Sequence, residues 1–420
     1  MNNYMDKIMA FVENNLSAKL QGATKNAYIS GLQSAVSKTI PMIFVSSIIT
    51  IYNIIRNFAP FLPNLSAISN YSFGLIGLFM GFLVPFYILE KKENKNKYIG
   101  GLTGLALYMM TVNPTVTDAG YVYNFTSFGA GGMFVAIIAG VFVVFVFSCF
   151  KKFTVFGEDS AMPDFCKEWF DTLLPIFTVI FAGWFVILNC KIDLYSILVN
   201  VFRPILDISS TYIGMLLMLL IPTIFYTMGI SGWIFSPIFT PIQNTALAAN
   251  IEAWAAGQPL PFIYTAGLNP GYLKLGGQGN TLPLNYFFLF SKSKRLRSLG
   301  KAFLVPGLLN INEPIIFGTI VWNPILMIPC WITAIVNLTM TYLAMRMGLV
   351  LAPHVTMGMW YLPVPIPAIL VGGIPGLILC LINLGLDAFI WYPFFKVYEK
   401  KVMAEDGELE MGKESRYVSS

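Results

Sequence analysis

One carboxylate lies far from any other charged residue in the amino-acid sequence, within the segment LLNINEPIIFG at residues 308–318. Across residues 302–345, Glu313 is the only charged side chain, and it lies between Asn312 and Pro314. Proline interrupts a helix and frees backbone groups, so an acid, an amide and open backbone groups would meet at one place. Such a cluster suits a sugar, whose hydroxyl groups need acceptors and donors together. The alternatives are that Glu313 caps a half-helix or lies at the cytoplasmic surface.

A second polar break, GGQGNTLPL at residues 276–284, has three glycines within four positions. Glycine lets the backbone approach a ligand closely. The break lacks the Lys-Ser/Thr pair of a nucleotide-binding P-loop, so a nucleotide is not expected there. A plain connecting turn is the alternative interpretation.

Two further breaks interrupt apolar sequence: TMGISGWIF at residues 227–235, with Ser231 between two glycines, and MWYLPVPIPAILVGG at residues 359–373. The prolines of the latter exclude a regular helix. His354, the only histidine, precedes it and is expected to be an interfacial or otherwise satisfied side chain. One histidine and five scattered cysteines leave no pattern for a metal site or a histidine-based triad. We therefore expect neither a metal nor a cofactor.

The composition places these breaks in a membrane protein. The chain has 420 residues, of which 56% are hydrophobic and only 11% are charged. Soluble proteins have about a quarter of their residues charged. The apolar runs are longer than the alternating strands of a membrane barrel, so they indicate helices. Within such a helix, an ionisable residue is by default a functional candidate. The net charge of +5 is no sign of nucleic-acid binding, because the basic residues cluster at the ends of apolar runs.

Six apolar runs in the first part of the chain approach the length that a spanning helix needs, about 20 residues. These runs cover residues 39–55, 73–89, 98–112, 132–150, 174–188 and 212–228. Residues 162–173 are expected to form an interfacial amphipathic helix, and residues 193–206 a second surface helix.

Lysine and arginine predict the orientation of these helices. Lysines precede the first run and follow the second and the fourth, whereas residues 113–128 contain neither Lys nor Arg. The positive-inside rule places both termini and the basic segment 291–301 in the cytoplasm. An even number of spans follows, about ten. Residues 229–290 and 302–372 are apolar but broken by Gly, Pro and Asn, as is typical of the binding site of a transporter.

The breaks NINEPIIFG, GGQGNTL and VPIP, with VGG after it, resemble the membrane (IIC) component of bacterial sugar phosphotransferase systems, in the lactose/cellobiose/diacetylchitobiose group. The resemblance extends from the N-terminal segment to YPFFKVYEK at residues 392–400. It implies an all-α polytopic protein with about ten transmembrane helices, two re-entrant hairpins and interfacial amphipathic helices. It also implies a homodimer in the bacterial cytoplasmic membrane that moves its sugar, a β-linked disaccharide or a similar sugar, by an elevator-type motion.

The resemblance further implies a division of the chain. A cytoplasmic amphipathic segment covers residues 1–36, and a scaffold half with the dimer interface covers residues 37–190. A sugar-binding transport half covers residues 191–401, and a cytoplasmic tail covers residues 402–420.

The resemblance also assigns roles to individual residues. The acid of the Asn-Glu-Pro motif, Glu313, would contact sugar hydroxyls and assist phosphoryl transfer, with Asn312 beside it. The Gly-rich loop would bind sugar through Gly277, Gly279 and Thr281. Relatives carry a sugar-contacting histidine where this chain has Ser231. The partners implied are IIA and IIB phosphocarrier proteins, and a phosphocysteine on the separate IIB protein would be the phosphoryl donor. Whether the chain itself counts as an enzyme is left open.

Two other functions remain possible from the sequence. A sugar permease or sensor that has lost phosphotransfer would explain the serine at position 231. An ion- or proton-coupled secondary transporter would carry several acids inside its membrane segments, whereas Glu313 stands nearly alone here.

Overall fold

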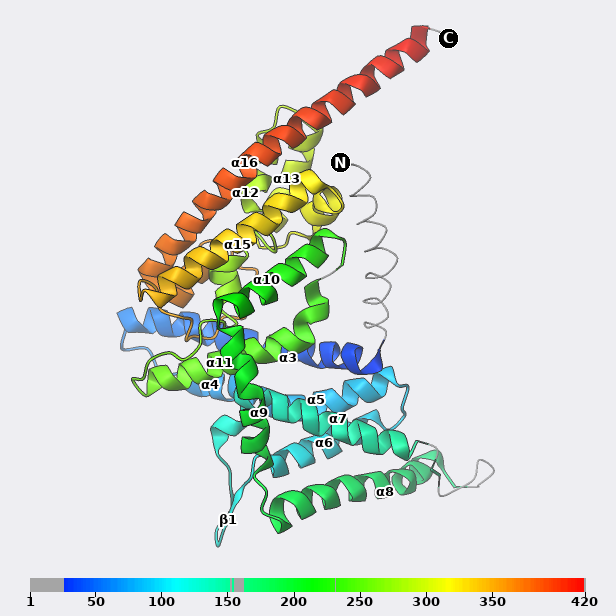
Figure 1. Cartoon of the computed structure of the whole chain (residues 1–420). Helices are drawn as coiled ribbons and strands as arrows, with labels where there is room; N and C mark the ends of the chain where they lie inside the picture. Colours follow the sequence, from blue (N-terminus) through cyan, green and yellow to red (C-terminus); the bar gives the residue numbers. More distant parts are fainter. Residues whose placement is uncertain (1–25, 152, 155–161, 231, 419–420) are drawn as a thin grey trace. The chain divides into compact units, whose positions relative to one another are not determined.

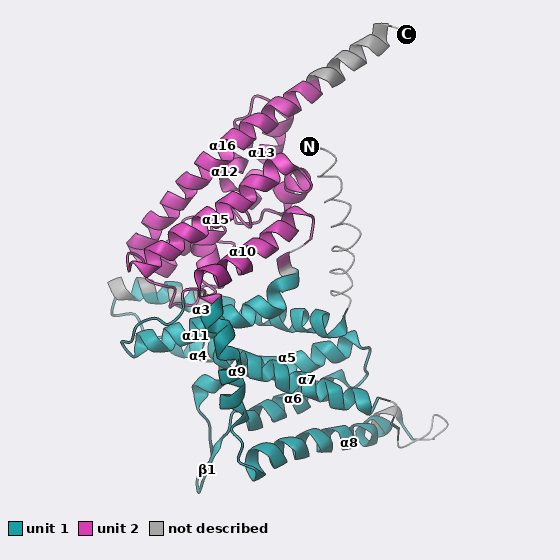
Figure 2. Cartoon of the chain, in the orientation of Figure 1, with its two compact units in different colours: residues 1–208, 233–262 teal, residues 209–232, 263–420 magenta. Residues whose placement is uncertain are grey.

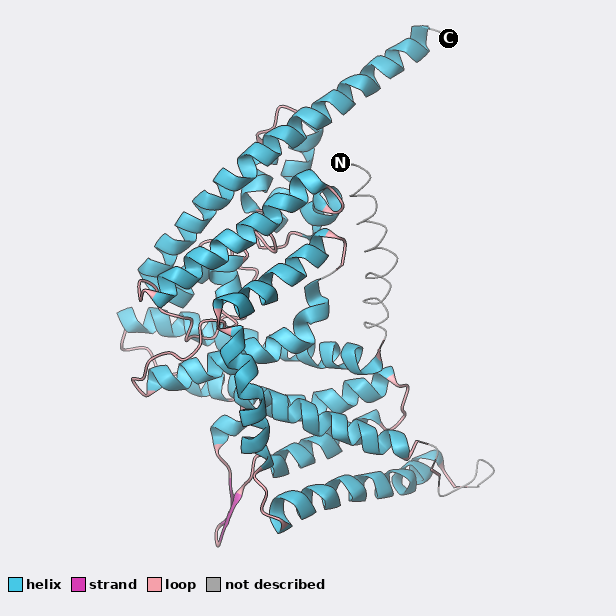
Figure 3. Cartoon of the chain, viewed as in Figure 1, coloured by secondary structure: helices cyan, strands magenta, loops and turns pink. Residues whose placement is uncertain are grey.

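The structure is a computed structural model, and it describes residues 26–151, 153–154, 162–230 and 232–418. Ser231 and most of the predicted N-terminal segment 1–36 therefore lie outside the described residues. The regular secondary structure of the described chain is helical apart from one hairpin, in which β1 (Thr115–Thr117) pairs antiparallel with β2 (Gly120–Val122) (Figure 3). The predicted all-α class is confirmed.

The α-helices follow one another along the whole described chain (Figure 1). They are α3 (Ala27–Phe58), α4 (Ser66–Asn70), α5 (Ile76–Lys91), α6 (Lys97–Thr111), α7 (Met133–Cys149), α8 (Asp164–Gly183), α9 (Leu194–Ser209), α10 (Tyr212–Thr227), α11 (Ser236–Ala255), α12 (Leu282–Leu289), α13 (Lys294–Leu308), α14 (Glu313–Ile315), α15 (Pro324–Arg346) and α16 (Ile366–Val418). Short 3-10 or π turns extend or precede several of them, among them η5 (Trp184–Asn189), η7 (Asn269–Leu273) and η8 (Ile316–Ile320).

Six helical segments of the described chain are long and apolar enough to cross a membrane. The number rises to seven if α9 and α10, which are bent against each other, count together as one span. That count is below the expected ten partly because α6 has 15 residues and α10 has 16, fewer than the about 20 residues that a straight spanning helix needs. Short helices of this kind belong to the broken architecture that the glycines and prolines predict.

The predicted interfacial helices have different outcomes. Residues 162–173 do not form a helix of their own, because α8 runs without interruption from Asp164 to Gly183. Pro163 precedes the first turn, and Pro175 is accommodated inside the helix. The surface helix predicted over residues 193–206 is present as α9. Its exposed apolar residues recur on one face, as an interfacial helix requires. They are Ile197, Val201, Ile205 and Ile208.

The chain divides into two compact units (Figure 2). Unit 1 consists of residues 1–208 and 233–262, and unit 2 consists of residues 209–232 and 263–420. The predicted scaffold and transport halves, 37–190 and 191–401, describe functions that this division does not test, and they stay predictions.

Helix α5 is the centre of unit 1, where it packs against α3, α6 and α7. Glycines bring α5 and α6 close together. A Cβ atom on Gly104 of α6 would lie 2.5 Å from the carbonyl oxygen of Gly81 on α5. Helices in membranes associate through such small residues, because lipid tails provide no hydrophobic drive between them. The outer face of α8 is instead aromatic, with Phe177 and Phe181 exposed and stacked at a centroid distance of 5.6 Å.

Unit 2 is built on α15, which packs against α10 and α16, while α12 packs against α13 and α16. Its core contains Phe288, Leu326 and Trp391. The regular helices are interrupted where the sequence predicts breaks. Helix α10 ends before Gly229, and α16 is broken at Gly373, whose φ is +62°. These interruptions leave loops in the interior of unit 2, and the site described below is made of them.

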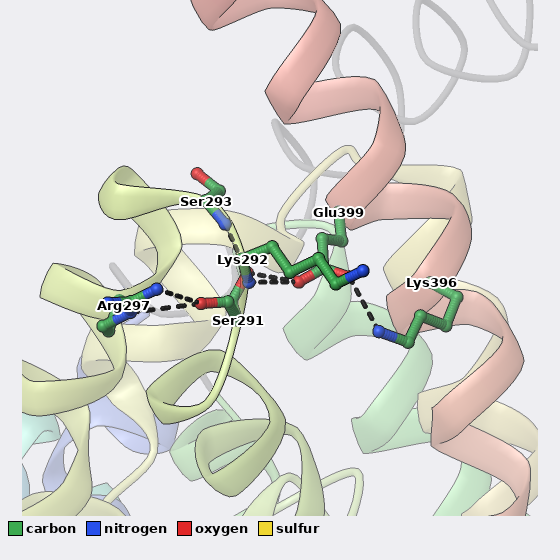
Figure 4. A network of polar contacts seen from close by, with 6 residues as sticks. All are labelled: Ser291, Lys292, Ser293, Arg297, Lys396 and Glu399. Carbon is green, nitrogen blue, oxygen red and sulfur yellow. Dashed lines mark hydrogen bonds and ion pairs between the residues drawn. The ribbon is translucent and has the colours of Figure 1, made fainter.

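A buried carboxylate fixes the loop between α12 and α13 to α16 (Figure 4). One oxygen of Glu399 accepts hydrogen bonds from Ser291 Oγ at 2.6 Å and from the Lys292 backbone amide at 2.7 Å. Its other oxygen pairs with Lys396 Nζ at 2.8 Å. Arg297 donates from Nε and Nη2 to the Ser291 carbonyl. The basic segment 291–301 is therefore anchored at its start.

Candidate functional site

Asn312 joins two of the predicted breaks. Its Nδ2 atom donates to the Gln278 carbonyl at 2.7 Å and lies 3.2 Å from Thr281 Oγ1. Asn312 is buried and precedes the first turn of α14. The Asn-Glu-Pro segment and the Gly-rich loop, more than 30 positions apart in sequence, therefore form one structure.

The Gly-rich loop requires its glycines. Gly277 and Gly279 have φ values of +94° and +87°, a region that favours glycine. A side chain at Gly277 would overlap the Asn312 amide, and one at Gly279 would lie 2.9 Å from Cys330 Sγ. Thr281 closes the loop by donating from Oγ1 to the Gly276 carbonyl at 2.8 Å. The loop is thus a rigid turn packed on Asn312.

A second asparagine connects this loop to the Pro-rich break. Asn310 Oδ1 accepts from the Gly276 amide at 2.8 Å. Its Nδ2 atom lies 2.9 Å from the carbonyl oxygens of both Trp360 and Leu362. Three of the four breaks that the sequence singles out are therefore held together by the side chains of two asparagines.

Glu313 is presented at the surface of this assembly. It is the first residue of α14, and its side chain is exposed in the isolated chain. In the described part of the chain no lysine or arginine forms an ion pair with it. The Tyr226 hydroxyl of α10 interacts with its carboxylate and lies 3.5 Å from Asn312 Oδ1. The acid is thus available to a ligand, with a phenol and an amide beside it.

Two further polar side chains belong to the site and are not among the predicted residues. Lys274 Nζ donates to Gln278 Oε1 at 3.1 Å, and Gln278 Nε2 donates to Thr223 Oγ1 of α10 at 3.0 Å. Lys274 is the only charged residue in positions 253–291. Its isolation is the same signal that singles out Glu313, and it would have identified this lysine as well.

Ser231 lies outside the described residues, but its neighbours are described. After the end of α10, the Ile230 amide donates a hydrogen bond to the Phe225 carbonyl at 2.9 Å. A Cβ atom on Gly232 would lie 3.3 Å from Gln278 Oε1. At Gly232, the residue after Ser231, the break at residues 227–235 therefore lies close to the Gly-rich loop.

The assembled groups are acceptors, donors and one carboxylate, which together can bind a molecule with many hydroxyl groups. No group of three or more His, Cys, Asp or Glu among the described residues could hold a metal ion. His354 Nδ1 lies 3.0 Å from the Ala352 carbonyl oxygen, a hydrogen bond within its own loop.

Comparison with known proteins identifies the family. The sequence model of the family "Phosphotransferase system, EIIC" matches residues 33–334. The chain belongs to the phosphotransferase system EIIC family. The lichenan permease IIC component of Bacillus subtilis (strain 168) is 27% identical to this EIIC component, over 97% of each chain. The oligo-beta-mannoside-specific EIIC component of the same organism is 27% identical over 91% of this chain and 92% of its own.

A solved structure has the same fold as this EIIC component. It is the crystal structure of the transporter ChbC, the IIC component from the N,N'-diacetylchitobiose-specific phosphotransferase system. The two align with a TM-score of 0.83 and 24% identity, covering 94% of this chain and 99% of the other. Family membership and the relatives, together with the apolar helices, make this chain a multi-pass membrane protein and a sugar permease component. Such components act with IIA and IIB proteins. The alternative of a permease without phosphotransfer is not favoured.

Proposed function

We propose that this permease carries a short β-linked sugar, a disaccharide or a similar oligosaccharide, and presents it for phosphorylation by a IIB protein. The observation that carries the proposal is the joining of the Asn-Glu-Pro segment to the Gly-rich loop through Asn312. The names of two relatives, one for lichenan and one for oligo-beta-mannosides, support the class of sugar.

Within this proposal, Glu313 accepts hydrogen bonds from sugar hydroxyls and takes the proton of the hydroxyl that becomes phosphorylated. A carboxylate within hydrogen-bond reach of the nucleophile can accept its proton as a general base. Tyr226 lies beside the acid and keeps it oriented. The sugar lies against the Gly-rich loop and the residue that holds it, namely Gly277, Gly279, Thr281 and Asn312.

Ser231 is proposed to contact the sugar from the break after α10, where relatives carry a histidine. A hydroxyl provides one donor and two acceptor lone pairs but does not titrate near neutral pH. Replacing Ser231 with Ala should weaken binding roughly five- to a hundredfold, the effect of about 1–3 kcal/mol for a buried hydrogen bond. Binding that stays unchanged for every sugar tested would make Ser231 a small packing residue only.

Transport is proposed to proceed by an elevator-type motion of a homodimer, with unit 2 carrying the sugar. The support is that every described candidate site residue lies in unit 2. Bacterial relatives and the lysine pattern support a place in the bacterial cytoplasmic membrane with both termini inside. Ser298 is exposed on α13, so Ser298→Cys in a chain without other cysteines tests the orientation. An impermeant thiol reagent added to intact cells should not label it, and labelling would overturn the orientation.

The proposal is tested with purified protein, a panel of disaccharides and the cognate phosphorylated IIB protein. We expect saturable binding of one or more β-linked disaccharides and their conversion to sugar phosphates only when phosphorylated IIB is present. Glu313→Gln should retain the fold and lose phosphorylation by about 100-fold or more, the range of general acid–base catalysis. Exclusive binding of α-linked sugars, or full activity of Glu313→Gln, would refute the proposal.

A further inference from the structure

The C-terminal end of α10 carries three polar side chains, and each contacts a different part of unit 2. Thr223, Tyr226 and Thr227 lie three to four positions apart or adjacent, so they share one side of the helix. Thr223 accepts a hydrogen bond from Gln278 of the Gly-rich loop, and Tyr226 interacts with Glu313. Thr227 is fully buried, and its contacts lead to a third place, the start of α15.

Both the side chain and the backbone of Thr227 are bonded to the segment that follows Glu313. Its Oγ1 atom accepts a hydrogen bond from Trp331 Nε1 of α15 at 3.0 Å and donates to the Ile224 carbonyl at 2.8 Å. Its carbonyl oxygen accepts from the Trp322 amide at 3.2 Å. The hydroxyl therefore acts as a donor and as an acceptor, and a serine could keep both hydrogen bonds whereas a valine could keep neither.

Trp322 has a backbone conformation that a bulky side chain disfavours, since its φ is +56°. Residues in such conformations persist only where the surrounding structure fixes them, and they are concentrated at functional sites. Trp322 lies two residues after η8, which continues α14 and therefore belongs to a short helical segment that begins at Glu313. The hydrogen bond from Trp322 to Thr227 thus fixes the far end of the segment that presents the acid.

Two adjacent residues of α10 therefore hold this segment at both of its ends. Tyr226 contacts Glu313 through its hydroxyl and Phe317 through its ring, with ring centroids 5.8 Å apart. Thr227 holds the segment at Trp322. Because the two residues are neighbours in the chain, a shift of Thr227 would move the Tyr226 hydroxyl relative to Glu313.

We propose that Thr227 is a positioning residue, which holds α10 against residues 313–322 so that Tyr226 keeps the Glu313 carboxylate oriented toward the sugar. This inference rests on the proposed function, in which Glu313 binds the sugar. A threonine that only stabilised the fold would affect the unfolding temperature and would leave the sugar affinity of the folded protein unchanged.

The first measurement is hydrogen exchange of the purified full-length protein in lipid nanodiscs, without sugar. Thr227→Val keeps the shape of the side chain but removes the acceptor for Trp331 Nε1. Peptides that cover residues 226–230 and 316–323 should exchange faster in this variant, because local opening becomes easier. Thr227→Ser should exchange as the wild type does. Thr103→Val, at a buried threonine of unit 1 whose hydroxyl bonds within its own helix, should leave both peptides unchanged. Unchanged exchange in Thr227→Val would overturn the proposal.

The second measurement is the sugar affinity from isothermal titration, in a double-mutant cycle with Tyr226→Phe. Thr227→Val should weaken binding about tenfold, within the range for the loss of one buried hydrogen bond, and Thr227→Ser should restore it. If Thr227 acts through the Tyr226 hydroxyl, Thr227→Val should weaken binding little further once that hydroxyl is absent. Fully additive effects would overturn the proposal, because Thr227 would then act independently of Tyr226. Wild-type affinity in Thr227→Val would also overturn it.

The titration uses the best-bound sugar of a panel that contains both β-linked and α-linked disaccharides. If the wild type bound only α-linked sugars, the proposed function would fail, and the cycle with the best-bound of these sugars would still decide the role of Thr227. If β-linked sugars bound and Thr227→Val matched the wild type, the proposed function would stand and the role of Thr227 would fail.

Discussion

The two units differ in the amide side chains that they bury. Among the described residues, the buried asparagines of unit 2 are Asn280, Asn285, Asn310, Asn312, Asn337 and Asn383, whereas those of unit 1 are Asn94, Asn244 and Asn250. Several buried hydroxyls of unit 1 bond back to their own helices, as when Thr39 Oγ1 donates to the Val36 carbonyl at 2.7 Å and Thr103 Oγ1 to the Ile99 carbonyl at 2.8 Å. The hydroxyl groups of such a helix are hydrogen-bonded within the helix, so its outer surface can pack as an apolar surface. Glycines such as Gly104 then let neighbouring helices approach closely.

Several buried amides of unit 2 reach across to other segments. Asn310 and Asn312 hold the Gly-rich loop, and Asn383 holds the backbone before it. Hydrogen bonds of this kind, from a buried amide to the backbone of another segment, favour one conformation of the groups that they join. The difference indicates that unit 1 is optimised for packing and unit 2 for the geometry of a site. Matched substitutions in the two units should therefore affect different properties, stability in the first and sugar binding in the second.

The largest effect is expected from Gly277→Ala. The new methyl group would overlap the Asn312 amide, and φ at this position is +94°. Because the loop must move, sugar binding measured by isothermal titration should fall by about 100-fold or more, equivalent to the ~3 kcal/mol or greater effect of misplaced site residues. Gly385→Ala on α16, where a Cβ atom meets nothing within 4 Å, is the matched control and should bind normally. Normal binding by Gly277→Ala would contradict the assignment of this loop.

The complementary change in unit 1 is Gly104→Ala. Its Cβ atom would lie 2.5 Å from the Gly81 carbonyl oxygen, so α5 and α6 must separate. Overpacking of this kind destabilises by about 1–3 kcal/mol. We expect a lower Tm and a sugar Kd within about twofold of the wild type for the folded fraction. A weakened Kd with an unchanged Tm would remove the contrast between the units.

An intermediate effect is expected from Lys274→Met, which removes the lone charge of residues 253–291 and frees Gln278. Hydrogen bonds to charged groups contribute about 1.5–3 kcal/mol, so sugar binding should weaken roughly tenfold or more. Lys294→Met, at an exposed position of α13, serves as the control in the same titration. Equal affinities for the two variants would show that Lys274 acts only in folding.

The smallest effect should come from Trp391→Phe. The change keeps an aromatic ring but removes the Nε1 donor to the Asn280 carbonyl. Loss of this one support, worth about 1 kcal/mol, should weaken sugar binding by about fivefold. Trp184→Phe, at an exposed position of unit 1, should have no effect on the titration. A change of the sugar Kd in Trp184→Phe, with no change in Trp391→Phe, would contradict the contrast between the two units.

The sequence predicts the membrane class, the helices of the first part of the chain and the approximate positions of the breaks, because hydropathy and the absence of a proline amide act locally. The irregular part of the Pro-rich break is shorter than the predicted 359–373, because α16 begins at Ile366 and Pro367 is accommodated in its first turn. It identifies Glu313 through its isolation. It does not predict which breaks meet, because the Asn312 and Asn310 hydrogen bonds join segments more than 30 positions apart. Lys274 is equally isolated in sequence, but only its contact with Gln278 shows that it belongs to the same loop. The sequence analysis also separates residues 162–173 from the span that follows, whereas α8 continues from Asp164 to Gly183 with Pro175 inside the helix.

The central claim is that the sugar lies on the joined loops of unit 2 against Glu313. The most direct measurement is isothermal titration of the best-bound disaccharide into Glu313→Gln, with Glu168→Gln at an exposed position of α8 as the matched control. We predict that Glu313→Gln unfolds at the wild-type temperature and binds at least tenfold more weakly, since a charged acceptor of sugar hydroxyls is lost. Glu168→Gln should bind as the wild type does. Wild-type affinity in Glu313→Gln would contradict the account.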